Sequence, residues 1–187
     1  MACFKLGYYK RNTESDIVSE YKSHITRGEH KFDCLTSCLN VLRSESWKAD
    51  VVYAWMHGKT INLETIFMII DKFSSESWKN DIIMKWMYCN TINLETIFLI
   101  IDKFSSESWK NDIIAKWMYG KTINFAMIIT IINKFSSESW KNDIIAKWMY
   151  GKTITFDMLT DIINFLQNHG KMILLQNGCM VKQLHLI

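Results

Sequence analysis

The chain has 187 residues, of which 49% are hydrophobic and 22% are charged, and it contains no proline. Lysine and arginine together number 22 against 19 aspartates and glutamates, so the formal net charge is +3. This composition excludes disordered and collagen-like chains, and so small a charge does not by itself indicate nucleic acid or an anionic membrane as the partner. The length allows one domain or two small ones.

Membrane and export signals are not expected. The longest apolar stretches fall far short of the roughly 20 residues that span a bilayer, and no long apolar run follows the first lysines. An odd number of cysteines without a framework spacing favours a reducing compartment, so we expect a cytoplasmic protein. The cysteines are Cys3, Cys34, Cys38, Cys89 and Cys179.

A 31-residue period organises the chain. The tetrapeptide Ser-Glu-Ser-Trp recurs at this interval, and a second tryptophan follows each first one after eight residues. All 8 tryptophans belong to these two series, so the aromatic content is a property of the repeat. The first series is Trp47, Trp78, Trp109 and Trp140, and the second is Trp55, Trp86, Trp117 and Trp148.

We predict a single repeat domain over residues 1–187. A degenerate unit over 1–41 aligns best from Arg11 to Val41, and residues 166–187 are interpreted as a C-terminal capping half-unit. The alternative for that last segment is a β-hairpin around Asn177-Gly178, a strong turn signal. Between them lie four regular units: 42–72, 73–103, 104–134 and 135–165.

Each unit begins with a predicted helix. In the second regular unit Ser74 is the expected N-cap, and Phe73 is expected to pack on Trp78. Apolar residues then follow at 78, 82, 83, 86 and 87, which is helical spacing. In later units this helix should end near Tyr119 and Tyr150, where Gly120 and Gly151 allow a left-handed conformation. Cys89-Asn90 replaces that glycine once, so the helix end must shift or be strained there.

The second helix of the unit is predicted from about Leu94 to Lys103. Asn93 is its expected N-cap. The helix is apolar over most of its circumference and leaves Glu95, Asp102 and Lys103 for water. One hairpin of helices cannot bury such a helix, but a stack of hairpins can. The sequence therefore predicts an all-α protein, an α-solenoid of stacked helix-turn-helix repeats.

The two-helix layout of about 31 residues resembles the tetratricopeptide class of repeats. It departs from that class because bulky residues replace the small ones and the terminal proline is missing. The chain is also similar, from Leu42 to Phe165, to an uncharacterised family of tandem units that begin Phe-Ser/Asp-Ser. Here Phe104-Ser105-Ser106 and Asn124, which opens the second helix, carry the similarity. This resemblance implies no activity, cofactor or catalytic residue.

The preference for lysine over arginine indicates an AT-rich source. Only three of the 22 basic residues are arginines. The third and fourth regular units are identical from their opening phenylalanine to Ile123 and Ile154, which indicates recent tandem duplication. A large DNA virus or an AT-rich protist is the expected source.

Two repeated features could bind ligands, and each has a simpler interpretation. The tryptophans could stack against bases or a carbohydrate, but their spacing is what core packing alone demands, and core is favoured. The lysine rows could track phosphates, but each unit also carries acids, so solvated faces are favoured. These rows are Lys48, Lys79, Lys110 and Lys141, and Lys85, Lys116 and Lys147.

No catalytic or metal site is predicted. A zinc site built from His24, His30, Cys34 and Cys38 is conceivable, but packing is favoured because free cysteine is usually a small buried residue. Phosphate-binding loops and nucleophile or metalloprotease motifs do not occur. We therefore expect no enzyme activity and no cofactor.

The functional hypothesis is a non-catalytic scaffold that binds a protein or a peptide. The alternatives are a polyanion or nucleic acid bound along the lysine rows, which is disfavoured, and a self-assembling structural protein that forms a homo-oligomer. No membrane partner is expected. The candidate contact residues are Tyr88, Tyr119, Tyr150, Lys79, Lys110 and Lys141.

Overall fold

The computed structural model describes residues 13–28 and 31–150, together with 155, 160, 161 and 164. These residues form helices and turns without a strand, which confirms the all-α class. The predicted half-unit 166–187, the hairpin at Asn177-Gly178 and Gly151 lie outside them. The helices are α1 (Glu14–Thr26), α2 (Phe32–Val41), α3 (Glu45–Met56), α4 (Leu63–Ile70), α5 (Glu76–Tyr88), α6 (Leu94–Ile101), α7 (Glu107–Met118), α8 (Phe125–Ile132) and α9 (Glu138–Met149).

The chain divides into two compact units, each larger than one 31-residue repeat, and the boundary lies inside α7. We call Met1–Ile113 the first unit and Ile114–Ile187 the second unit. The 31-residue period is visible in both, because the helices that open the regular units begin at Glu45, Glu76, Glu107 and Glu138. Helix α1 begins 31 residues before α3, at Glu14. The degenerate N-terminal unit therefore folds as the same pair of helices.

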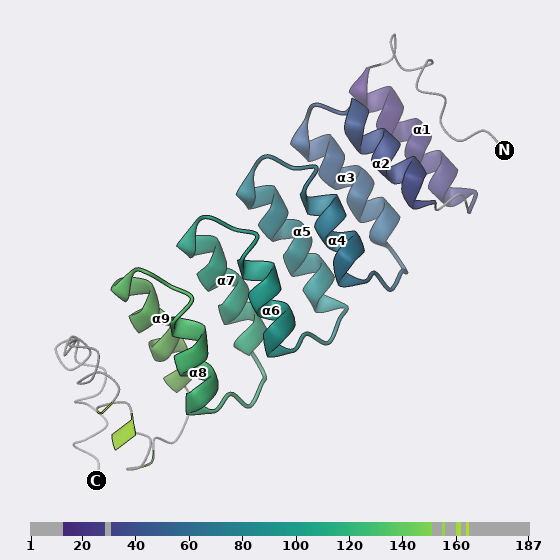
Figure 1. Cartoon of the computed structure of the whole chain (residues 1–187). Coiled ribbons are helices and arrows are strands. Elements are labelled where there is room, and N and C mark those ends of the chain that lie inside the picture. The colour runs from purple at the N-terminus through teal and green to yellow at the C-terminus, as the bar shows by residue number, and fades with distance from the viewer. Residues whose placement is uncertain (1–12, 29–30, 151–154, 156–159, 162–163, 165–187) are drawn as a thin grey trace. The chain divides into compact units, whose positions relative to one another are not determined.

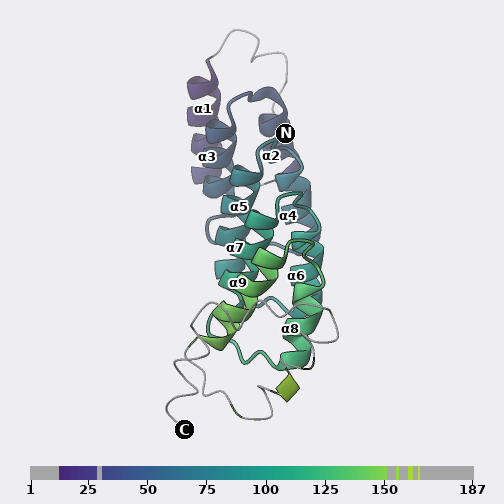
Figure 2. The same cartoon turned by 90° about the vertical axis from the view of Figure 1, so that its left-hand side faces the viewer.

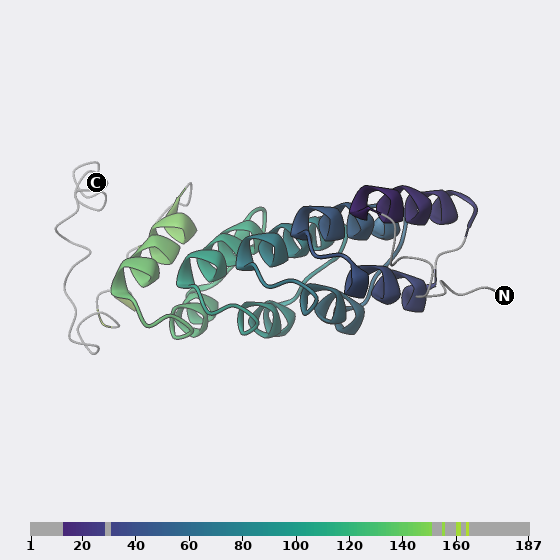
Figure 3. The same cartoon turned by 90° about the horizontal axis from the view of Figure 1, so that it is seen from above.

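In the first unit the helices form two layers. Helices α1, α3 and α5 lie side by side (Figure 1), and α2, α4 and α6 form the other layer, as Figures 2 and 3 show from two further sides. Helix α3 packs against α1, α2 and α5, and α4 packs against α5. The inward residues of α2, α4 and α6 occupy equivalent positions and are buried: Leu35, Cys38 and Leu39, then Ile66, Ile69 and Ile70, then Ile97, Ile100 and Ile101.

The second helices begin as predicted. The Asn93 side chain accepts a hydrogen bond from the Thr96 N–H at 2.7 Å, and Asn62 and Asn124 cap α4 and α8 in the same way. Helix α6 ends at Ile101, two residues before the predicted end, because the Lys103 N–H turns to the Ile100 carbonyl, three residues back. Glu95, Asp102 and Lys103 are exposed, as expected.

The first helices begin one residue later than predicted. The N-cap of α5 is Ser75, not Ser74, and its side chain makes no capping bond. Instead the Ser74 N–H donates to Glu45 Oε1 at 2.5 Å and the Ser75 N–H donates to Glu45 Oε2 at 3.1 Å. Glu45 belongs to the preceding hairpin, so this contact joins residues 29 and 30 positions apart just ahead of α5.

This arrangement, which we call the glutamate clamp, occurs three times in the first unit. Glu76 accepts hydrogen bonds from the Ser105 N–H at 2.5 Å and the Ser106 N–H at 3.1 Å, ahead of α7. Glu14 accepts them from Arg43 and Ser44, ahead of α3. Each clamp binds backbone donors that precede or open a helix, where a negative charge is favoured.

Helix α1 is capped without a clamp. The Thr13 N–H donates to Asp16 Oδ2 at 3.0 Å, and the Asp16 N–H donates to Thr13 Oγ1 at 3.3 Å, which forms a capping box. Thr13 and Asp16 stand where Ser44 and Trp47 stand in the next unit. The Thr13 N–H, which corresponds to the Ser44 N–H that Glu14 binds, is thus satisfied within α1 itself.

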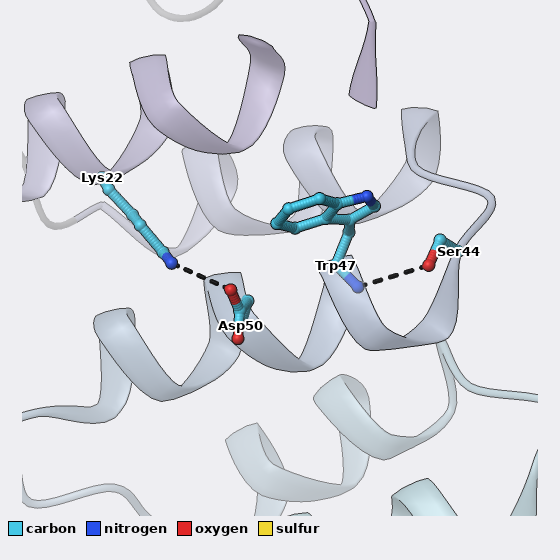
Figure 4. Close-up of polar contacts among 4 residues, drawn as sticks. All are labelled: Lys22, Ser44, Trp47 and Asp50. Carbon is cyan, nitrogen blue, oxygen red and sulfur yellow. Dashed lines mark hydrogen bonds and ion pairs between the residues drawn. The ribbon is translucent and has the colours of Figure 1, made fainter. Parts of the chain in front are cut away.

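Four further contacts join successive hairpins of the first unit. The Lys22 ammonium of α1 lies 3.0 Å from Asp50 Oδ2 of α3 (Figure 4), and one period later the Tyr53 hydroxyl donates to Asp81. Figure 4 also shows the Trp47 N–H directed at the Ser44 hydroxyl, the N-terminal cap of α3. In the layer of α2, α4 and α6, Lys72 donates to Asn40 at 3.0 Å. One period later, Lys103 pairs with Asp71 at 3.4 Å. The Lys22–Asp50 pair is half-buried and the other three pairs are exposed, so these contacts fix alignment more than they add stability.

The first helices end in two ways. Gly58 and Gly120 have φ of +69° and +70°, the left-handed conformation expected at Gly120. Where Cys89 replaces the glycine, α5 continues to Tyr88 and Cys89 keeps a φ of −96°. The Asn90 side chain then donates to the Trp86 carbonyl at 2.7 Å. The helix end therefore shifts, and no left-handed strain arises at the cysteine.

The two tryptophan series differ in burial, which corrects the expectation that both belong to the core. Trp55, Trp86, Trp117 and Trp148 are buried, with exposed fractions of 4–6%. Trp47, Trp78, Trp109 and Trp140, in the first turn of their helices, are only half-buried. The first turn lies near the end of the layer, where fewer neighbours cover a large ring. Only the second series is fully enclosed.

We predict that Trp86→Ala destabilises the first unit by about 3–5 kcal/mol, since it removes a buried ring. Trp78→Ala, in the same helix, is expected to cost clearly less because that ring is half exposed. Urea unfolding followed by circular dichroism compares the two. Equal losses would contradict the division of the tryptophans into a buried and a half-buried series.

We predict that Glu76→Ala lowers stability by about 1–3 kcal/mol at neutral pH, because backbone donors lose a charged acceptor. Glu95→Ala, at the start of α6, is the control. Desolvation raises the pKa of Glu76, but the hydrogen bonds from Ser105 and Ser106 and the charge of Lys79 outweigh it, so the pKa is lowered. The clamp therefore stabilises above the usual carboxyl pKa, and its contribution disappears as pH falls through the lowered value.

Urea unfolding of both variants and the native chain, at neutral pH and in acid below that pKa, checks this prediction. The difference between Glu76→Ala and the native chain should shrink in acid. A difference that is the same at both pH values would contradict an ionic clamp.

Candidate functional site

The three tyrosines predicted as contact residues are strongly exposed. Tyr88, Tyr119 and Tyr150 have exposed fractions of 83%, 86% and 89%. They occupy one position of the repeat, at the end of the first helix, and His57 holds that position one period earlier. Among the described residues, the other exposed large hydrophobic side chains, Met68 and Leu99, are only half exposed. Tyrosine with this much free ring surface is typical of residues that contact partners.

A groove of about 620 Å³ lies beside Tyr88 in the first unit. One wall is the turn after α3, residues 56–61, together with Tyr53. The other wall is the end of α5, with Lys85, Trp86 and Tyr88, followed by residues 89–90. The groove is therefore formed where one hairpin meets the first helix of the next.

A second groove, of about 420 Å³, lies in the second unit. Its lining comprises residues 118–121 and Ile123 with Ala115 on one wall, and Lys147, Trp148 and Tyr150 on the other. Each of these residues stands two periods after a residue that lines the first groove. The two grooves are thus the same structural feature of the repeat, with Ala115 in place of Tyr53 and Tyr119 in place of His57.

The same hydrogen bond joins the walls of both grooves. The Trp86 indole N–H donates to the Ile61 carbonyl at 2.7 Å, and the Trp148 indole N–H donates to the Ile123 carbonyl at 2.8 Å. The buried ring also packs on the start of the preceding second helix, as Trp148 does on Phe125 with ring centroids 6.0 Å apart. Trp86 and Trp148 therefore have a defined role, which is to hold one hairpin against the next below each groove.

Lysines give each groove a positive charge. The Lys59 ammonium lies 3.9 Å from the centroid of the Trp55 ring, and the Lys85 ammonium lies 3.4 Å from that of Tyr53. Partial burial lowers the pKa of Lys59. In the second groove Lys121 lies 5.3 Å from the Trp117 centroid, and Lys147 pairs with Asp143 at 2.6 Å. The described residues that line the two grooves include no carboxylate.

The structure separates the predicted tyrosines from the predicted lysines. Lys79, Lys110 and Lys141 lie in the first turns of α5, α7 and α9 and are half-buried. Lys79 and Tyr88 are nine residues apart on one helix, which places them about 13 Å apart along its axis. The candidate tyrosines and lysines therefore lie at opposite ends of their helices.

Lysines of the Lys79 row also interact within the protein. Lys141 pairs with Glu138 at 2.9 Å, and the equivalent Lys48 donates to the Lys72 carbonyl at 2.9 Å. These contacts reduce what this row offers to a polyanion.

The conceivable zinc cluster is not assembled among the described residues. Cys38 is fully buried in α2, and burial raises the pKa of its thiol to about 12, which disfavours the thiolate that a metal binds. His30 lies outside the described part of the chain. No helix in that part has both the length and the apolar content that a membrane crossing requires.

The sequence predicted the tyrosines as contact residues but did not mark Lys59 and Lys121, which line the grooves. A usable signal was present, because Gly-Lys-Thr-Ile occurs at Gly58 and again at Gly120. Its meaning depends on the neighbouring hairpin, which supplies the other wall.

No protein-family model, curated protein or solved structure matches the chain.

Proposed function

We propose that the chain is a non-catalytic scaffold, an α-solenoid of stacked helix-turn-helix repeats that binds a segment of a protein or a peptide in its tyrosine-rimmed grooves. The observation that carries this proposal is the recurrence of one groove, with equivalent lining residues, in both units. A groove that depended on the particular sequence of one loop would not recur with equivalent lining residues two repeats later. Each groove suits a short extended segment of a protein or peptide chain.

The chemistry of the grooves favours binding over catalysis. The charged groups that the two grooves share are lysines, whereas a catalytic site places an acid, base or nucleophile in one special environment. Met56, Ile61 and Trp86 supply apolar walls, and Tyr88 supplies an exposed ring at the rim. Such a mixture of apolar wall, aromatic rim and a few polar groups is typical of sites for side chains.

The two alternatives receive less support from the described residues. Lys48 and Lys141 already interact within the protein, and arginine, the residue best suited to bind phosphate, is scarce. Head-to-tail self-assembly through the first hairpin would use the Thr13 N–H ahead of α1, but that donor already binds Asp16.

Selection of a phage-displayed random peptide library on the full chain tests the proposal. We expect enriched peptides whose affinity for the triple variant Tyr88→Ser, Tyr119→Ser, Tyr150→Ser falls about tenfold or more, since three exposed aromatic contacts are lost. The matched control is Met68→Ser with Leu99→Ser, which removes exposed apolar side chains from the layer of α2, α4 and α6. The control should bind as the native chain does.

Selection without enrichment would contradict the proposal. So would peptides that bind the tyrosine variant as tightly as the native chain, because the grooves would then not be the binding surface.

A further inference from the structure

We propose that each groove binds an acidic segment, and that its carboxylates are held by Lys59 and Lys85 in the groove of the first unit and by Lys121 and Lys147 in the groove of the second. This inference rests on the proposed function, because it names the chemistry of the ligand for the same grooves. The occupant is an extended peptide segment in which aspartate or glutamate alternates with apolar residues.

The first step is the placement of the lysines. Lys59 lies on the turn wall and Lys85 on the helix wall of one groove, so a side chain that enters between the walls meets an ammonium on each side. Lys121 and Lys147 occupy the same two walls in the other groove. The lysine pair persists although Tyr53 gives way to Ala115, so the positive charge is the more constant property.

The second step is the preorganisation of these ammonium groups. In the first groove each one lies over an aromatic face, Lys59 over Trp55 and Lys85 over Tyr53. A cation placed over a ring is attracted to it and loses part of its freedom before a ligand arrives. Partial burial also lowers the pKa of Lys59, because it removes water from the ammonium. A carboxylate bound beside that ammonium would favour its charged form.

The third step is charge complementarity. Two lysines and no carboxylate line each groove among the described residues. Asp143, which pairs with Lys147, stands outside the lining, and the pair is exposed enough for a second carboxylate to share the ammonium. A carboxylate is therefore the charged group that fits between the walls.

The fourth step distinguishes an acidic peptide from a nucleic acid. The groove lysines stand among apolar and aromatic residues, Met56, Ile61 and Trp86 in the first groove. A phosphate backbone would need a continuous positive track, but Asp81 and Asp143 lie one helical turn before Lys85 and Lys147. An acidic peptide can place a carboxylate between the lysines and an apolar side chain against the wall.

Fluorescence anisotropy with the full chain tests the inference. The probes are a fluorescein-labelled peptide of repeating Glu-Leu-Gly triplets, the same peptide with Gln for Glu, and an oligothymidylate. We expect the Glu peptide to bind about tenfold or more tightly than the Gln peptide, because charge-assisted hydrogen bonds are lost with the carboxylates. Its affinity should also fall with added salt, unlike that of the Gln peptide.

Two quadruple variants with the same net charge locate the contacts. Changing Lys59, Lys85, Lys121 and Lys147 to Gln should lower affinity for the Glu peptide about tenfold or more. Changing Lys48, Lys79, Lys110 and Lys141 to Gln, at the opposite ends of the helices, should leave it within about twofold, since that row lies outside the grooves. Circular dichroism verifies that both variants are folded. If a variant does not fold, the salt dependence of Glu-peptide binding by the native chain still tests whether charge contributes to the affinity.

The outcomes separate this inference from the function on which it rests. Equal binding of the Glu and Gln peptides, both lost in the triple tyrosine variant, would overturn the acidic ligand but retain peptide binding. Loss of binding in the Lys48 row variant alone, or tighter binding of oligothymidylate than of the Glu peptide, would also overturn it. Failure of both peptides to bind, or binding that ignores the tyrosines, would overturn the proposed function as well.

Discussion

The glutamate clamp is the interaction on which the arrangement of the first unit depends. A carboxylate at the start of one first helix binds two backbone N–H groups that lead into the next first helix, as Glu45 does with Ser74 and Ser75. Those donors have no partner in their own helix. The Ser74 and Ser75 N–H groups are therefore satisfied only when the preceding hairpin is in place. This makes neighbouring hairpins depend on one another, which is the expected source of cooperativity in a repeat protein.

The other end of each first helix is fixed by a different contact, and this one creates the grooves. The Trp86 indole binds the Ile61 carbonyl, which closes the junction between the α3 turn and α5 at its base but leaves it open above. The left-handed glycine at Gly58 reverses the chain so that Lys59 stands beside this opening. A groove is thus a consequence of how two hairpins join, and it recurs because the joint recurs. Duplication of the 31-residue repeat can therefore add a further groove without any new kind of contact.

The sequence predicted what depends on neighbours along the chain and missed what depends on the next hairpin. Asn93 was recognised as a cap because its partner, Thr96, is three residues away. Ser74 was assigned as a cap wrongly, because the group that binds its N–H is Glu45, in another hairpin. The tryptophan pattern indicated packing, but it could not show that Trp86 is enclosed while Trp78 remains half exposed, since both lie on one helical stripe. For the site, position alone marked Tyr88 as exposed, whereas the role of Lys59 became visible only with the opposite wall in place.

Amide hydrogen exchange measured by NMR tests the central claim most directly. The amides of Ser74, Ser75, Ser105 and Ser106 precede the first helical residue, so in an isolated helix they would exchange at nearly the unprotected rate. The clamp predicts clear protection of all four, lost together when the adjacent hairpins separate. Exchange of these amides at unprotected rates, while amides inside α5 remain protected, would contradict the claim that a glutamate from one hairpin holds the start of the next.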